Sequence, residues 1–121
     1  MAIPEHTDRR IFVLQAEICR ALAHPVRIEV LHLLGEGKMS FADLLQRTEI
    51  TKTKLSQHLA VLRRARIVTP LRHGGRVFYR LTYPEIETAC EAVTKVLTKH
   101  LAQTRNETSV LLRRVSGARK G

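Results

Sequence analysis

The sequence predicts a mainly α-helical domain with one small β-hairpin. Of its 121 residues, 44% are apolar and only 4% are aromatic, with no tryptophan, a composition that suits packed helices. Apolar residues recur at helical spacing over most of the chain, and a glycine pair separates two strand-like runs. A chain of this length supports one hydrophobic core, which excludes a large multidomain enzyme.

A first helix is predicted over residues 8–23 and a second over residues 25–34. Pro25 suits the first turn of the second helix, because its missing N–H would have no partner there, and Gly35 and Gly37 end that helix. The apolar positions that set the helical spacing are Ile11, Leu14, Ile18 and Leu22 in the first helix and Val26, Val30, Leu33 and Leu34 in the second, with Ile28 and Leu31 on a second face.

Two further helices joined by a tight turn follow a short connecting segment. Residues 38–40 are long enough only for a bridge or a minimal strand. Ser40 is the expected N-cap of a helix over residues 41–47, and Thr51 is the expected N-cap of a helix over residues 53–65. The buried stripe of this last helix is expected to consist of Leu55, Leu59 and Leu62.

A β-hairpin and a long helix complete the domain. Strands over residues 67–72 and 76–81 flank Gly74 and Gly75, which readily take the positive φ of a tight hairpin turn, and Pro70 places the first strand at a sheet edge. Thr82 and Glu85 read as a capping box for a helix that runs to about residue 105. The predicted order is α-α-(β)-α-α-β-β-α over residues 1–105, followed by a basic tail, residues 106–121, that extends the helix and is then mobile.

Most of the positive charge lies in one segment of the chain. The formal net charge is +10, and residues 51–81 contain eight basic residues and no Asp or Glu, whereas the rest, apart from the basic tail, is slightly acidic. An ordinary solvated face would carry both signs of charge. The segment therefore predicts a surface that faces phosphates.

This basic segment coincides with the second of two short helices and the hairpin, a combination typical of a winged helix-turn-helix. Such a helix enters the major groove of DNA, and the slim hairpin contacts the flanking backbone or the minor groove. His58 is equally compatible with packing at the edge of the helix. The candidate DNA-binding residues are Lys52, Thr53, Lys54, Ser56, Gln57, His58, Arg64, Arg72 and Arg76.

Three blocks of sequence resemble the ArsR-type winged-helix repressors, the arsenic- and metal-responsive family. They are ALAHPVRIEVLHLL (residues 21–34), TKTKLSQHLAVLRRARIV (51–68) and GGRVFYRLT (74–82). The resemblance implies a homodimeric repressor of a bacterial or archaeal operon, with residues 53–65 as the recognition helix and residues 67–81 as the wing. It also implies dimerisation through the first and last helices, and an inducer that releases the operator DNA.

The inducer sites of the resembling family are not evident in this chain. The stretch where family arsenic sensors carry thiolates has no cysteine, and the carboxylates and His100 near the last helix do not match the family's zinc spacing, so no metal or other cofactor is expected. Cys19 and Cys90 lie on apolar helix faces, which is usual for inert buried cysteines. The alternative is a thiol switch that responds to reactive sulfur or an oxidant.

Other functions find little support in the sequence. No nucleophile has a plausible partner set and no glycine-rich loop opens a helix, so the chain is not expected to be an enzyme. It has no signal peptide or membrane span, which predicts a cytoplasmic protein. The rival hypothesis is an architectural DNA- or RNA-binding module that uses its charge without reading sequence and has no inducer.

Overall fold

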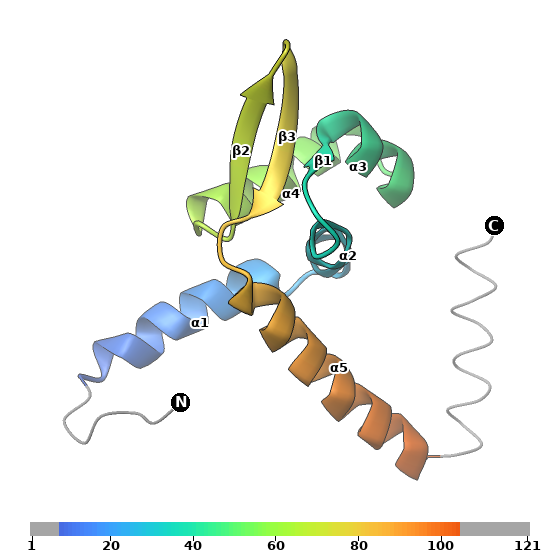
Figure 1. Cartoon of the computed structure of the whole chain (residues 1–121). Coiled ribbons are helices and arrows are strands. Elements are labelled where there is room, and N and C mark those ends of the chain that lie inside the picture. The colour runs from blue at the N-terminus through green and yellow to red at the C-terminus, as the bar shows by residue number, and fades with distance from the viewer. Residues whose placement is uncertain (1–7, 105–121) are drawn as a thin grey trace. The chain divides into compact units, whose positions relative to one another are not determined.

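The computed structural model describes residues 8–104 and confirms the predicted order of elements (Figure 1). The described residues fall into two compact units divided after Glu87, the first holding all elements except most of the last helix. No described helix is long and apolar enough to cross a membrane. The elements are α1 (Arg10–Leu22), α2 (Pro25–Leu34), β1 (Met39–Ser40), α3 (Phe41–Thr48), α4 (Lys52–Arg64), β2 (Val68–His73), β3 (Arg76–Leu81) and α5 (Glu85–Gln103).

The core of the first unit is almost entirely aliphatic. The predicted stripe of α4 is confirmed, since Leu55, Leu59 and Leu62 are all buried, and they lie in the same core as Leu44 of α3. Truncating any one of these leucines to alanine is expected to destabilise the fold by about 2–5 kcal/mol. From α2 the core takes Val30, Leu31, Leu33 and Leu34, whereas Val26 is only half-buried and Ile28, predicted on a second apolar face, is exposed.

Side-chain caps define both helices of the helix-turn-helix. The Ser40 hydroxyl accepts a hydrogen bond from the Asp43 N–H at 3.0 Å, and the Thr51 hydroxyl accepts one from the Lys54 N–H at 3.2 Å, as predicted. The turn between the helices places Glu49 in the left-handed region, with φ +56°. The buried Thr48 hydroxyl donates to the Leu44 carbonyl one turn earlier, so this buried hydroxyl has a hydrogen-bond partner.

The sheet has three antiparallel strands in the order β1-β3-β2. Pro70 lies on an edge strand, as predicted, because β2 pairs only with β3. Gly74 and Gly75 both have positive φ and form the two-residue turn between His73 and Arg76. Residues 39–40, expected to form at most a minimal strand, do pair with β3 and thereby join the hairpin to the start of α3.

The capping box predicted at the start of α5 is wrong. The Thr82 hydroxyl instead shares a hydrogen bond of 2.9 Å with the Thr69 hydroxyl, and the Thr82 N–H donates to the Ile67 carbonyl. Thr82 thus continues the β2–β3 pairing past the last residue of β3. The first turn of α5 is closed by a backbone bond from the Ile86 N–H to the Tyr83 carbonyl.

Candidate nucleic-acid interface

The exposed face of α4 is set by helical geometry. At 100° per residue, Thr53, Gln57 and Arg64 lie on the side of α4 opposite the buried leucine stripe, and all three are exposed. Ser56 and His58 lie on the two flanks of this exposed stripe. The helix therefore presents a hydroxyl, an amide and a guanidinium in one row, groups that can bond to base edges and phosphates.

The amino-terminal end of α4 is basic as well. Lys52 and Lys54 lie in its first turn, are exposed, and have no acidic residue beside them in that turn. The amino terminus of a helix already carries a partial positive charge, so two lysines there are electrostatically unfavourable. An anion bound at this end would offset that repulsion. This end of the helix is thus electrostatically suited to a phosphate group.

The hairpin carries further cations near its tip. Arg72 and Arg76 are exposed and flank the glycine turn, and Figure 1 shows the hairpin extending away from the helices. The Arg76 guanidinium lies 5.6 Å from the centre of the Phe78 ring, and the Lys38 ammonium lies 5.4 Å from the same ring. The sequence does not mark Lys38 as part of this basic surface, because only the pairing of β1 with β3 brings it beside Phe78.

One hollow of about 400 Å³ lies where α3, α4 and the hairpin meet. Ser56 lines it from α4, Phe41 and Ala42 line it from the start of α3, and Arg76 and Tyr79 line it from β3. Two of the predicted DNA-binding residues, Ser56 and Arg76, are thus brought to one concave surface. The sequence did not indicate the contribution of α3, which depends on the position of Ser40 in β1.

His58 lies against the start of α2, on the other flank of α4. Its ring centroid is 4.3 Å from that of His24, and its Nδ1 lies 3.4 Å from Nη1 of Arg27. Burial and the nearby charges of His24, Arg27 and Lys54 lower the pKa of His58. His24 itself caps α2, since its Nδ1 accepts a hydrogen bond from the Val26 N–H. This cluster was missed because its members come from two distant helices.

The two cysteines differ from the expectation for inert buried residues. Cys19 is exposed on α1, and Cys90 on α5 is partly buried. Burial raises the pKa of the Cys90 thiol, which lowers its thiolate content at neutral pH. Cys19 is therefore the more accessible thiol of the two.

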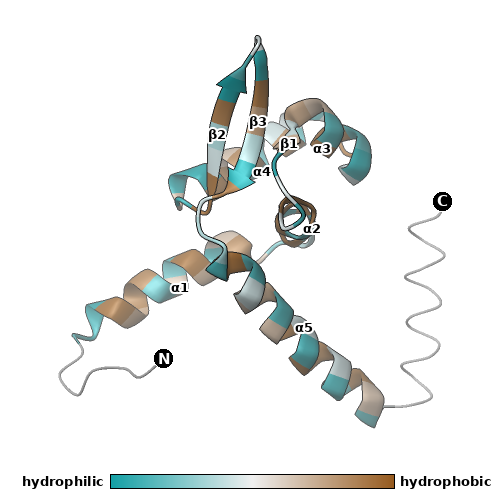
Figure 2. Cartoon of the chain, in the orientation of Figure 1, coloured by the Kyte–Doolittle hydropathy of each residue, from teal (hydrophilic) through white to brown (hydrophobic). Residues whose placement is uncertain are grey.

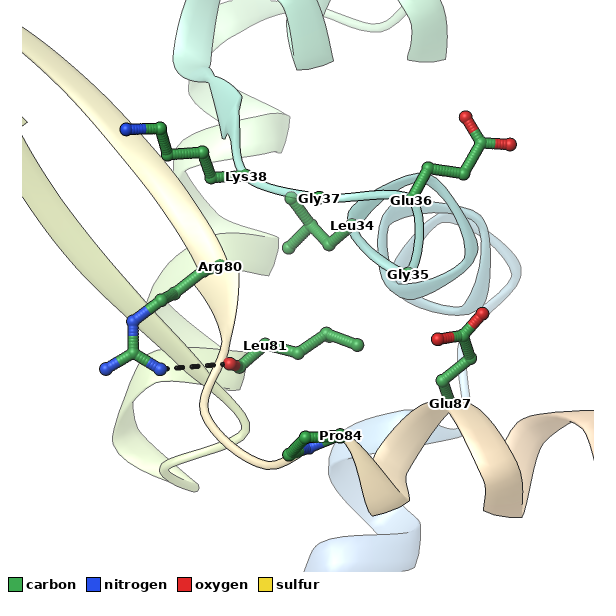
Figure 3. Close-up of a pocket in the computed structure, with 9 residues that line it drawn as sticks. All are labelled: Leu34, Gly35, Glu36, Gly37, Lys38, Arg80, Leu81, Pro84 and Glu87. Atoms are coloured by element: carbon green, nitrogen blue, oxygen red, sulfur yellow. Dashed lines mark hydrogen bonds between the residues drawn. The ribbon is translucent and has the colours of Figure 1, made fainter.

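A second hollow, of about 280 Å³, lies at the carboxyl end of α2 (Figure 3). Figure 3 shows the carboxylates of Glu36 and Glu87 on one side of this hollow and the cationic groups of Lys38 and Arg80 on the other. A Cβ atom on Gly35 would lie 2.9 Å from the Glu87 carboxyl group, so any larger residue at this position requires that flexible side chain to move. Within residues 8–104, no three His, Cys, Asp or Glu side chains are grouped so as to hold a metal ion.

Comparison with known proteins identifies relatives that share most of this chain. Residues 24–69 match the model of the bacterial regulatory protein arsR family. The chain is 38% identical over 93 residues to an uncharacterised HTH-type transcriptional regulator of Mycobacterium tuberculosis, Rv0081, covering 76% of this chain and 82% of that protein. It is 42% identical over 67 residues to a biofilm growth-associated repressor of Xylella fastidiosa, covering 55% of this chain and 59% of the repressor.

Solved structures agree with these sequence matches. The crystal structure of Rv0081 superposes with a TM-score of 0.73 at 36% identity, covering 80% of this chain and 98% of that one. The homodimeric winged helix-turn-helix DNA-binding domain of a Mycobacterium bovis regulator superposes with a TM-score of 0.72 at 25% identity, covering 84% of this chain and 95% of that domain. The fold is therefore a winged helix-turn-helix, and the relatives are DNA-binding regulators of transcription rather than enzymes.

Proposed function

Because the chain belongs to the arsR family of bacterial regulatory proteins, we propose that it is a homodimeric repressor that binds a two-fold symmetric operator in double-stranded DNA. In this proposal α4 is the recognition helix and the β2–β3 hairpin is the wing. The repressor acts in the cytoplasm by occupying DNA that the polymerase needs.

The observation that carries the proposal is the exposed row of Thr53, Gln57 and Arg64 on a basic helix beside a basic wing. An α-helix with its side chains is about 10–12 Å across, close to the width of about 12 Å of the major groove of B-DNA, so α4 fits into the groove with its exposed face toward the DNA. No acidic side chain between residues 51 and 81 opposes the approach of the phosphates.

The residues divide into two roles. Gln57 and Ser56 read base edges, because an amide and a hydroxyl can each donate and accept hydrogen bonds. Most of the remaining candidates, together with Lys38, hold the phosphate backbone. These are Lys38, Lys52, Thr53, Lys54, Arg64, Arg72 and Arg76, whereas the candidate His58 packs against the start of α2.

The proposed dimer uses the apolar faces of the first and last helices. Figure 2 shows apolar stretches along both α1 and α5. On α1, Ile11, Phe12, Val13, Leu14 and Ile18 are all about half exposed, and on α5 Val93, Val96 and Leu97 are at least half exposed. Single exposed apolar residues are ordinary, but a run of five on one helix is typical of a surface that another chain covers.

A thiol-directed signal at Cys19 and Cys90 is proposed as the release mechanism. The exposure of Cys19 supports its reaction with an oxidant or a polysulfide, whereas the raised pKa of the partly buried Cys90 makes that thiol slower to react. Treatment with polysulfide should release DNA from the wild type and not from Cys19→Ser. Equal release from both proteins would remove the thiol proposal and leave the DNA-binding proposal standing.

Selection from a random DNA duplex library tests the DNA-binding proposal. A dimeric repressor should enrich an inverted repeat whose half-site centres lie about 10 bp apart or a multiple of that spacing. Retention of duplexes without any enriched motif would contradict the proposal. That result would identify the rival function, an architectural nucleic-acid-binding module.

A further inference from the structure

Two histidines and an arginine, with no carboxylate among them, meet where the start of α2 lies against α4. His24 is the N-cap of α2, Arg27 lies in the first turn of α2, and His58 belongs to α4. These three residues are called the histidine cluster below. His58 of this cluster lies on the flank of the row of exposed residues on α4.

The hydrogen bonds of the histidine cluster fix the charge of His58. An arginine guanidinium can only donate, so Nδ1 of His58 must accept at the 3.4 Å contact with Nη1 of Arg27. An imidazole nitrogen accepts only when it carries no proton. The arrangement in the structure is therefore that of an uncharged His58.

A proton on His58 has no favourable partner within the cluster. The groups whose charges act on His58 are His24 at the N-cap of α2, Arg27 of α2 and Lys54 of its own helix, and all of these are basic. Protonation would abolish the Arg27 hydrogen bond and place two cations in contact. Nε of Arg27 is already buried without a hydrogen-bond partner. Little water is therefore available at this end of the guanidinium to screen the repulsion between Arg27 and a protonated His58.

We propose that His24 and Arg27 are positioning residues that hold His58, and with it the recognition helix, against the start of α2 only while His58 is uncharged. Acidification then loosens this attachment and weakens sequence-specific DNA binding. The consequence for DNA rests on the proposed function, whereas the attachment itself can be measured without DNA.

The lowered pKa of His58 fixes the sign of the effect on folding. An unfolded chain binds a proton at this histidine at a higher pH than the folded chain does. The stabilisation by neutral His58 is therefore present above the ordinary pKa of 6.5 and is lost as the pH falls below it. Up to about one extra proton is bound on unfolding in this range.

Three variants test the attachment in the free protein. His58→Asn keeps an acceptor near the position of Nδ1 and cannot be protonated, so its unfolding free energy in urea should fall less between pH 7.5 and 5.5 than that of the wild type. His32→Asn, at an exposed position on the same α2, is the matched control and should follow the wild type. An equal loss in the wild type and His58→Asn would overturn the proposal.

The variant Arg27→Gln supplies a readout that a merely structural contact would not change. Glutamine can still donate to His58 but carries no charge, so the titration of the His58 ring, followed by NMR in the folded protein, should move to higher pH. An unchanged titration would also overturn the proposal. This measurement stands even where His58→Asn does not fold.

The DNA arm uses a duplex enriched from the random library and a scrambled duplex of equal length. Between pH 7.5 and 5.5 the wild type should lose preference for the enriched duplex, while His58→Asn should keep the preference that it has at pH 7.5. Equal losses in both proteins would contradict the proposed link to DNA. Absence of any preference in the wild type at pH 7.5 would instead contradict the proposed function, and the unfolding data would still decide the attachment.

Discussion

Ser56 of α4 and Arg76 of β3 line the same hollow, although one lies on the proposed recognition helix and the other next to the tip of the β2–β3 hairpin. The pairing of β1 with β3 fixes this relationship, since it ties the wing to the start of α3. A residue suited to reading bases and a residue suited to holding phosphates therefore lie at one concave surface. Specificity and affinity should consequently be separable by mutation.

Replacing Gln57 and Arg76 by alanine should separate the two roles. Gln57→Ala should lose about 1–3 kcal/mol of discrimination at particular base pairs, because the amide is proposed to bond to base edges. Arg76→Ala should weaken all duplexes alike and reduce the slope of affinity against salt by about 1. Titrations of both variants against enriched and scrambled duplexes at several salt concentrations measure the discrimination and the salt slope. Equal losses of affinity on all sequences from both changes would contradict the division into two roles.

Replacing Arg66 by glycine should stabilise the protein. Arg66 has φ +59°, and it follows α4 in a C-terminal motif in which its own N–H donates to the Arg63 carbonyl and the Ile67 N–H donates to the Leu62 carbonyl. Glycine adopts this conformation without steric penalty, so Arg66→Gly should gain about 0.5–1 kcal/mol in unfolding free energy. Arg66→Ala removes the same charge and keeps the strain. A similar gain from both variants would show that charge, not backbone strain, is responsible.

Replacing Ser40 by alanine should destabilise the protein by about 0.5–2 kcal/mol, because α3 loses its cap and the Asp43 N–H loses its acceptor. Ser40 is also buried, at 2% exposure. Ser56→Ala, on the exposed flank of α4, is the matched serine control and should change the unfolding free energy little. Chemical denaturation of the two variants makes the comparison, and equal stabilities would exclude the cap as a major contribution.

Much of the fold could be predicted from the sequence because its signals are local. The caps at Ser40 and Thr51 and the buried stripe of α4 each depend on residues within a few positions of one another. Thr82 was misassigned because its local pattern fits a cap, yet its hydroxyl is taken by Thr69 across the hairpin. The prediction of a second apolar face at Ile28 is wrong, because the periodicity of apolar residues does not show how wide the buried face of a helix is.

The parts of the site that were missed depend on contacts between distant segments. Lys38 reaches Phe78 only through strand pairing, and His24 meets His58 only when α2 packs against α4. No local pattern marks such contacts. The predicted roles of residues 106–121 fall outside the described residues.

Introducing a charge into the exposed apolar face of α1 should dissociate the proposed dimer. Leu14 is 58% exposed on α1, so Leu14→Glu should leave the fold of the subunit intact while burying a carboxylate in the interface. Ile28→Glu, at a position that is 50% exposed on α2, is the matched control and should remain dimeric. Sedimentation equilibrium measures both, and a dimeric Leu14→Glu would place the interface elsewhere.

The competition between an enriched duplex and a random duplex of equal length, at one fixed salt concentration, tests most directly whether α4 reads DNA sequence. The dimer carries roughly twice the formal charge of one chain and should contact about 8–12 phosphates, so charge alone gives tight but indiscriminate binding. A repressor should prefer the enriched duplex by about 10³-fold or more. A preference below about tenfold would contradict the reading of sequence by α4.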